Sequence, residues 1–521
     1  MQSSRVFFTV LLCCLAVLAW LLPDTGSAQP RKPQGGDEAR QGEDNLDDVL
    51  RRFGPEAEGL KAKIDEAIEK GVDWLLKQQK TDGSFDCYQQ AGLAFPMGGT
   101  ALPALALKKS IIGLYEGDAR DLKREISKLE RLEKSGKIEY IDSLRLKHLR
   151  EKGEAEVARR EAVLAAVHKS IDWIRNKYDA CKSSPQGLYT YDVGVTLMLL
   201  EGYYTEKQET KDGYVMGVNS RKIPKGDLDW IREMVNYLAG KLREPAYNAE
   251  KAPGRAWRYP GDVAQDGGTV DNSNTQYAVL GLKAGSRMGV DVPDKSIWKD
   301  VAEYFIAIQD PTGVKIPRKP PAINPADGKY FFPPQYTETQ PEDAARGWGY
   351  LSKRDQMHPT TGAMTTAALA ALVMAQSQLH DAGILKRDQD LAGKINRSLA
   401  DGMAWLGKYF AVDKNPLQTT SSINWHYYYL YGLERAGVLC QTEYFGEHPW
   451  YLEGAKYLVG KQNADGHWLG GDKNSGPPVG PNDQLITDTC FALLFLKRAT
   501  MPVNVPPVMK PVITGEDGDG K

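Results

Sequence analysis

Two kinds of helical pattern alternate along the chain from about residue 56 to residue 500. The first kind places apolar residues at helical spacing on one side and charged residues on the other, as in LDWIREMVNYLAGKL. It predicts a helix that is buried on one face only. The second kind, such as TGAMTTAALAALVMAQ, is rich in small and apolar residues and has few charges. It predicts a helix that is buried on most sides.

The two patterns pair into six predicted helical hairpins, each a half-exposed helix followed by a buried one. Two concentric rings of helices require this alternation, so the expected fold class is all-α. The predicted pairs are 64–79 with 100–115, 162–178 with 190–204, 228–242 with 271–289, 296–309 with 361–376, 395–410 with 423–437, and 455–468 with 483–499.

A short motif recurs near both ends of the chain. It reads VDWLLKQQKTDGSF at 72–85 and AKYLVGKQNADGHW at 455–468. In each copy a helix leads to a Gln, then to Asp-Gly, then to an aromatic residue two positions after the Gly. Asp-Gly favours a tight turn, because Gly takes positive φ at low cost. We expect the Gln amide and the aromatic ring to tie the end of the half-exposed helix to the next hairpin.

This unit resembles the repeat of the prenyltransferase and squalene-hopene cyclase superfamily. Weaker copies are IQDPTG followed later by GWGY, and the WRY of the third hairpin. The resemblance covers about residues 56–500 and implies an (α/α)6 toroid, in which six inner and six outer helices surround a central cavity. It is specific for the fold and not for a reaction.

The rest of the chain divides into four segments. Residues 1–28 predict a signal peptide, with Arg5 before an apolar run and small residues at its end; an uncleaved membrane anchor is the alternative. Residues 29–55 are expected to form a flexible linker, and residues 501–521 a Pro-rich and disordered tail. Residues 118–160 are heavily charged and predict a helical insertion in the connection after the first hairpin, either a solvated excursion or an arm that docks a partner.

Composition narrows the expected partners. A net charge of -2 gives no reason to expect a nucleic acid. The mature chain is expected to be extracytoplasmic, periplasmic or secreted, and to touch a membrane only transiently through its signal peptide. Its remaining cysteines are too few for a disulfide scaffold. The expected partner is a hydrophobic small molecule, a glycan or an extracytoplasmic protein.

Candidate chemistry lies at the starts of the buried helices, where free N–H groups and the helix dipole gather. Asp262, Asp266 and Asp271 are the candidate acid or base residues, although Asp271 also occupies an N-cap position. The resemblance implies an Asp-x-Asp-Asp acid motif for the hopene-type cyclases, and residues 56–500 do not contain one. The candidate ligand-binding residues are Trp257, Tyr259, Asn274, Trp348, Tyr350, Asn424, Trp425, His426 and Asp483.

The sequence favours a site without a cofactor, and a zinc site is the alternative. Asp488 and Cys490 resemble the Asp-x-Cys zinc pair of prenyltransferase β subunits, and His426 or His358 would have to complete it. No cofactor is otherwise expected.

Three functions stay open at this point. They are a toroid that binds a ligand or protein without covalent chemistry, a cyclase-like enzyme with a changed acid, and a glycan-processing enzyme. A dry aromatic cavity would favour a terpenoid or lipid, an open groove with paired carboxylates a glycan, and a filled centre a binding scaffold.

Overall fold

Most of the described chain is helical, which confirms the all-α expectation. The computed structural model describes residues 46–87, 89–90, 93–184, 187–210, 213–244, 253–259, 270–333, 342–351, 359–417, 425–470, 483–503 and 512–513. All of them belong to one unit of the chain, Gly42–Lys521. The predicted signal peptide and most of the predicted linker and tail lie outside the described residues.

Two sets of helices follow the predicted alternation. The core helices are α5 (Pro96–Ser110), α8 (Thr190–Tyr204), α10 (Asn272–Arg287), α12 (Gly362–Asp381), α15 (His426–Leu439) and α17 (Asp483–Leu496). The flanking helices are α4 (Leu60–Leu76), α7 (Tyr140–Lys182), α9 (Lys225–Gly240), α11 (Ser296–Ile308), α14 (Gln389–Lys408) and α16 (Trp450–Lys461). Short helices are α3 (Leu46–Arg51) and α13 (Ile384–Arg387).

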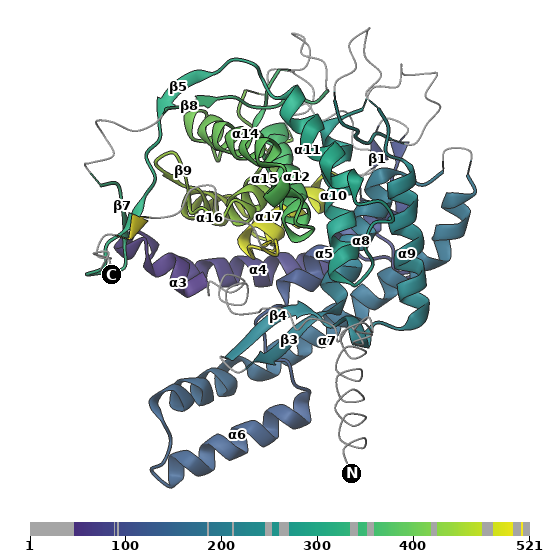
Figure 1. Ribbon diagram of the computed structural model, residues 1–521. Helices are drawn as coiled ribbons and strands as arrows, with labels where there is room; N and C mark the ends of the chain where they lie inside the picture. The colour runs from purple at the N-terminus through teal and green to yellow at the C-terminus, as the bar shows by residue number, and fades with distance from the viewer. Residues whose placement is uncertain are drawn as a thin grey trace, which may run out of the picture. The chain divides into compact units, whose positions relative to one another are not determined.

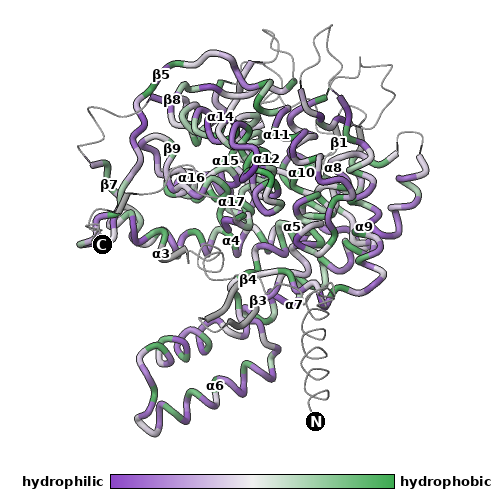
Figure 2. The backbone as a smooth tube through the Cα atoms, in the orientation of Figure 1, coloured by the Kyte–Doolittle hydropathy of each residue, from purple (hydrophilic) through white to green (hydrophobic). Residues whose placement is uncertain are grey.

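Burial separates the two sets as their sequences predict. Every residue of α12 from Gly362 to Ser377 is buried, because its Ala-rich surface lets neighbours approach on all sides. In α4 the buried residues, among them Ile64, Ile68 and Leu75, follow helical spacing along one face. Figure 2 shows the same contrast, with hydrophobic positions along α5 and α12 and a largely hydrophilic α6.

The core helices pack on one another in chain order. α5 contacts α8, α8 contacts α10, α10 contacts α12, α12 contacts α15, α15 contacts α17, and α17 contacts α5. The flanking helix α4 also contacts α16 and α17, so the first and last hairpins are neighbours. Figure 1 shows purple α4 beside yellow α17, from opposite ends of the chain.

A glutamine at the end of three flanking helices makes the same pair of bonds. Nε2 of Gln79 donates to Gly83 O (3.2 Å) in its own turn and to Ala166 O (2.7 Å) of α7. Nε2 of Gln462 likewise donates to Gly466 O (2.9 Å) and to Ala67 O (2.8 Å) of α4. Gln309 bonds Arg346 O and Ser398 O in the fourth hairpin and α14. These amides therefore tie each hairpin to the next flanking helix, as the repeat predicts.

The aromatic residue of the repeat secures each connecting loop to its own hairpin. The Trp468 indole donates to Leu458 O of α16 (2.8 Å), and Trp468 N donates to Thr489 Oγ1 of α17 (3.1 Å). Trp257 makes the equivalent bonds to Leu238 O and Thr275 Oγ1. Trp348 makes them to Phe305 O and Thr365 Oγ1. Each loop is thus fixed between its flanking and core helix.

The glycine of the Asp-Gly turn lies against the backbone of the next flanking helix. Gly83 has φ +94° and Gly466 has φ +106°. A Cβ at Gly83 would lie 2.5 Å from Lys169 O of α7, and one at Gly466 would lie 2.3 Å from Lys70 O of α4. Both turns therefore require glycine for its conformation and for close approach.

The charged insertion forms a helical arm with a core of its own. α6 (Ala119–Lys134) packs on the first half of α7 through Leu122, Leu129, Leu146, Leu149 and Val157. Its second helix differs from the expectation, because it continues without a break into the flanking helix of the second hairpin. Apolar and charged residues recur at helical spacing along α7, and no Pro interrupts it.

Two further segments depart from the predicted boundaries. The predicted linker ends at α3, whose Val49 and Leu50 are buried in the main core, so residues 46–55 are not a free linker. Short strands also form where few were expected. The longest, β3 (Thr205–Thr210) and β4 (Gly213–Val218), pair as an antiparallel hairpin after α8.

The other strands are of two to four residues each. They are β1 (Gln89–Gln90), β2 (Leu93–Ala94), β5 (Val314–Pro317), β6 (Ala322–Ile323), β7 (Tyr330–Phe331), β8 (Glu342–Ala345), β9 (Tyr444–Phe445), β10 (His448–Pro449) and β11 (Val512–Ile513). β5 pairs with β8, and β11 pairs in parallel with β6. Within the described residues, none of the helices has the length and apolar character to span a membrane.

The contact between the Asp-Gly turn of the sixth hairpin, at Gly466, and the first flanking helix, α4, can be tested by adding one methyl group. We expect Gly466→Ala to lower the free energy of unfolding by about 2 kcal/mol or more, since Ala disfavours positive φ and its Cβ would meet Lys70 O. Gly460→Ala, on the exposed side of α16 with open space around it, should stabilise by up to about 1 kcal/mol. Urea unfolding of both variants measures the difference. Equal effects would contradict the role assigned to the turn.

Candidate functional site

A cavity lies among the N-terminal halves of the core helices. Its wall consists of Phe95, Gly98, Gly99, Leu102, Tyr191, Val195, Tyr277, Tyr428 and Phe491. The enclosed part of the cavity has a volume of about 30 Å³, and the space reaches about 380 Å³ only when the open region at its mouth is included. The lining comes from α5, α8, α10, α15 and α17, and five of its side chains are aromatic rings. Rings from sequentially distant helices therefore meet around one space.

A chain of hydrogen bonds runs behind this aromatic wall. Tyr191 OH of α8 donates to Ser273 Oγ of α10 (2.6 Å), which bonds Tyr428 OH of α15 (2.7 Å). Gln276 Nε2 donates to the same Tyr428 oxygen, and Arg435 Nη2 donates to Gln276 Oε1 (3.1 Å). The chain links three core helices and holds the tyrosine rings in place.

Arg435 is a buried cation at the end of this chain. Only 1% of its surface is exposed, and its guanidinium carbon lies 4.1 Å from the centre of the Tyr431 ring and 5.6 Å from that of Tyr277. Its Nε and Nη1 atoms have no hydrogen-bond partner among the described residues. Burying unpaired donors of a charged group is costly. Arg435 is therefore a buried cation that packs against Tyr277 of the cavity wall and keeps donors in excess of its hydrogen bonds.

Asp271, predicted as an acid or a cap, is the N-cap of α10. Its Oδ1 accepts Asn274 N (2.7 Å) and its Oδ2 accepts Asn274 Nδ2 (2.8 Å). Burial raises the pKa of Asp271 to about 6, because the bonds from Asn274 and the Arg258 guanidinium 3.9 Å away offset only part of the desolvation. The cap prediction is confirmed, and the carboxyl is also protonated more easily than an ordinary aspartate.

Several predicted binding residues gather around this cap. Tyr259 OH and Tyr350 OH lie 3.3 Å apart, and burial raises the pKa of both phenols. Tyr259 also packs on Phe95 and Tyr191, whose rings line the cavity (6.0 Å and 5.7 Å between centroids). The structure therefore brings Tyr259, Tyr350, Asn274 and Asp271 together beside the cavity.

Asp192 is a second buried carboxyl, and the sequence analysis did not select it. Its Oδ1 accepts the backbone N–H of Gly98, at the start of α5 (2.6 Å). Burial raises the pKa of Asp192 to about 7, although hydrogen bonds from the backbone of Gly98, Tyr189 and Met97 lower it. Because Gly98 lines the cavity, this protonatable group lies directly behind the wall.

Residues 500–502, which we call the C-terminal strap, contact the C-terminal parts of α10 and α15. Thr500 donates from N and Oγ1 to the buried carboxyl of Glu434 on α15 (3.0 and 2.6 Å). Arg287, the last residue of α10, donates to Glu201 of α8 and to the carbonyls of Met501 and Pro502. Met501 and Pro502, the first residues of the predicted Pro-rich tail, thus pack there, while the cavity lies toward the N-terminal ends.

The two predicted tryptophan platforms are interior residues. Trp257 and Trp348 have no exposed area, and their indoles are bonded to flanking-helix carbonyls. Neither ring lines the cavity. They are structural counterparts of Trp468, a role that the degenerate WRY and GWGY repeats already signalled.

The other predicted site residues are spread out. His426 Nε2 bonds Val412 O (2.8 Å), and Trp425 packs against Tyr428 with φ 51° at the start of α15. Asp262, Asp266 and Asn424 lie outside the described residues, and the side chain of Asp483 is not described.

The candidate zinc pair has other partners. Asp488 accepts Gly470 N (2.8 Å) and Gln484 Nε2 (2.8 Å). Cys490 is fully buried, and burial raises the pKa of its thiol. Among the described side chains, no group of three or more His, Cys, Asp or Glu residues is arranged to hold a metal, and His358 is not described. The four described cysteines are free thiols.

Apart from Tyr428, which stands in the run of tyrosines at the start of the fifth buried helix, the aromatic residues of the cavity wall were not predicted from the sequence. Phe95, Tyr191 and Phe491 read as ordinary buried aromatics, because nothing local shows which face of a fully buried helix points inward. Asp192 carried a signal, since a carboxyl within a helix that is buried on most sides must itself be buried, and buried carboxyls are rare.

Because Asp192 is buried, we expect its contribution to the free energy of unfolding to decrease as the pH rises. Its pKa is raised from 3.8 to about 7 in the folded state, so the folded protein binds an extra proton between these values. Its contribution to stability is complete below the unfolded pKa and is lost as pH rises through about 7. Asp192→Asn should therefore gain stability relative to the native protein between about pH 4 and pH 8, on the order of a few kcal/mol. Denaturant unfolding across this range measures it, with the exposed Asp413→Asn as control. A constant difference would contradict the raised pKa.

Comparison with known proteins does not assign this site. No family model matches the chain, and no curated protein matches its sequence.

Proposed function

We propose that the chain is a six-hairpin (α/α)6 toroid whose central cavity binds an apolar small molecule. The toroid is supported by the packing of each core helix on the next and of α17 on α5. It is also supported by the glutamine and glycine contacts that join the last hairpin to the first. The repeat resemblance in the sequence is consistent with this arrangement.

The aromatic lining of the cavity is the observation that carries the binding proposal. Five rings and two aliphatic side chains, Leu102 and Val195, face the same space. Ligand pockets are commonly apolar, with few polar groups that set orientation. The tyrosine rings are held in place by the hydrogen bonds of their hydroxyl groups. The apolar surface is therefore preorganised, which lowers the entropic cost of binding.

The polar groups behind the cavity wall indicate which polar group the ligand could carry. Arg435 has unused donors, and Tyr191 and Tyr428 are already bonded to Ser273. An electron-rich end, such as a hydroxyl, carbonyl or carboxylate, would match the Arg435 donors if it reached past the tyrosines. The ligand class is therefore an apolar body with at most one polar end.

A glycan is a poorer match. Sugar-binding sites stack exposed aromatic faces on the rings and place paired carboxylates in an open groove. Trp257 and Trp348, which would have to stack, are fully buried. Asp271 is engaged as a helix cap.

A cyclase-like enzyme stays the second candidate, on one observation. Asp192 and Asp271 are buried carboxyls near the cavity whose pKa values are raised to about 7 and about 6. A protonated carboxyl next to an apolar cavity is a proton donor, and aromatic faces stabilise a developing cation. This reading requires a route for the proton from Asp192 or Asp271 to the cavity.

Filling the cavity tests the binding proposal. Val195→Phe adds a ring to the cavity wall, so we expect it to weaken binding of the fluorescent apolar probe N-phenylnaphthylamine by about tenfold or more. Val314→Phe, at a position 53% exposed on β5, is the matched control and should not change binding. Probe fluorescence titrations give both dissociation constants, and circular dichroism checks the fold.

Two results would count against this function. Unchanged probe binding in a folded Val195→Phe protein would show that the cavity is not the site. Turnover of squalene that Asp192→Asn or Asp271→Asn abolishes would replace simple binding with the cyclase alternative.

A further inference from the structure

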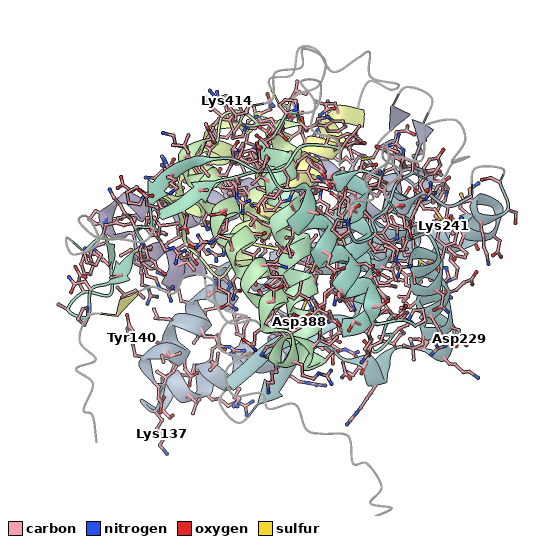
Figure 3. The ribbon with its side chains drawn as sticks, turned by 45° about the horizontal axis from the view of Figure 1, so that its top comes forward. Lys137, Tyr140, Asp229, Lys241, Asp388 and Lys414 are labelled. Carbon is pink, nitrogen blue, oxygen red and sulfur yellow. The ribbon has the colours of Figure 1, made fainter. Side chains whose placement is uncertain are left out.

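Three large apolar side chains are exposed together at the outer end of the helical arm. Tyr140 and Ile141 are each 76% exposed, and Leu144 is 50% exposed. All three lie in the first turns of α7, just after the connection from α6. Figure 3 shows Tyr140 and Lys137 at this end of the arm. We call these three residues the arm tip.

The arm does not need these residues for its own stability. Its internal seam consists of Leu122 and Leu129 of α6 and Leu146, Leu149 and Val157 of α7. Successive helical residues are 100° apart, so Tyr140, Ile141 and Leu144 fall on the face away from that seam. Single exposed apolar residues are normal, but three adjacent ones at the end of a charged arm indicate contact with another surface.

Lysines surround the arm tip. Between residues 128 and 147 there are six basic and four acidic side chains. The arginines are engaged, since Arg145 pairs with Glu125 (2.6 Å) and Arg150 with Glu130 and Glu133 (3.1 and 3.0 Å). Four exposed lysines lie on this part of the arm: Lys128, Lys134, Lys137 and Lys147. The tip is thus apolar at its centre, and the segment around it, which also contains Glu139 and Asp142, has a net charge of +2 (six basic and four acidic side chains).

We propose that the arm tip docks on a membrane surface that contains anionic lipids. Ile141 and Leu144 would enter the boundary of the acyl chains, Tyr140 would lie at the headgroup level, and the lysines would contact lipid phosphates. A protein partner fits less well, because stable protein interfaces bury about 800 Å² per partner and the tip offers only three apolar side chains. A lipid interface accepts a small convex apolar patch with a basic surround. The proposal does not depend on the ligand of the cavity.

Vesicle flotation of the full chain tests the docking. The vesicles are phosphatidylcholine alone or phosphatidylcholine with phosphatidylglycerol, and the test variant carries Tyr140→Gln, Ile141→Gln and Leu144→Gln. Gln favours helix, and the replaced side chains are exposed, so the melting temperature should not change. We expect the partition coefficient on the anionic vesicles to fall by about tenfold or more. The N-terminal apolar segment is common to all variants, so only differences between variants are read.

A second variant isolates the charge. Lys134→Gln with Lys137→Gln should reduce binding to anionic vesicles by about tenfold and leave binding to neutral vesicles unchanged. Val314→Gln is the control, because it also replaces an exposed apolar side chain (Val314 is 53% exposed on β5) but lies away from the arm. It should bind like the native protein.

Three outcomes would overturn the proposal. The first is native-like vesicle binding by the folded tip variant. The second is a folded Lys134→Gln, Lys137→Gln variant that binds anionic vesicles as strongly as the native protein does. The third is a tip variant that loses only self-association in light scattering, which would make a second copy of the chain the occupant.

Discussion

The structure depends on one type of contact, in which a glutamine side-chain amide at the end of a flanking helix donates hydrogen bonds to two hairpins at once. Gln79, Gln309 and Gln462 each donate to a carbonyl of their own loop and to a carbonyl of the next flanking helix. A repeat with exposed lateral faces cannot bury its core alone, so its neighbours must hold a fixed register. The Gln462 bond to Ala67 joins the end of the chain to its beginning and removes the two free ends that a row of hairpins would have.

Close helix approach follows from this fixed register. α8 and α10 meet at Gly194 and Gly281, where a Cβ on Gly281 would lie 2.8 Å from Gly194 Cα. Small residues where helices touch let the backbones approach, and larger side chains are placed elsewhere around the helix. The rings of Tyr191, Tyr277 and Tyr428 fill the space between core helices that are not sequence neighbours. The cavity is the part of that space they leave unfilled.

Polar groups are distributed unevenly along the core helices. At the N-terminal ends, Asp192 and Asp271 accept backbone N–H groups, which helix dipoles favour, yet burial keeps both carboxyls easily protonated. At the other ends, Glu201 and Glu434 are matched by Arg287 and the strap. One end is therefore closed by ion pairs and backbone, while the other carries the apolar cavity.

The hydrophobic pattern by itself determined the helices, their alternation and the repeat, because burial on one face or on all faces leaves a local record at helical spacing. Asp271 was recognisable as a cap and Asp-Gly as a turn for the same reason: both are local contacts. Tertiary structure alone decided that Trp257 and Trp348 are interior while Phe95, Tyr191 and Phe491 face a cavity. A residue on a fully buried helix has the same local pattern whether it meets a neighbour or an empty space. The tertiary structure also decided that Tyr140, Ile141 and Leu144 are exposed, because only the packing of α6 on α7 shows which apolar residues the arm leaves uncovered.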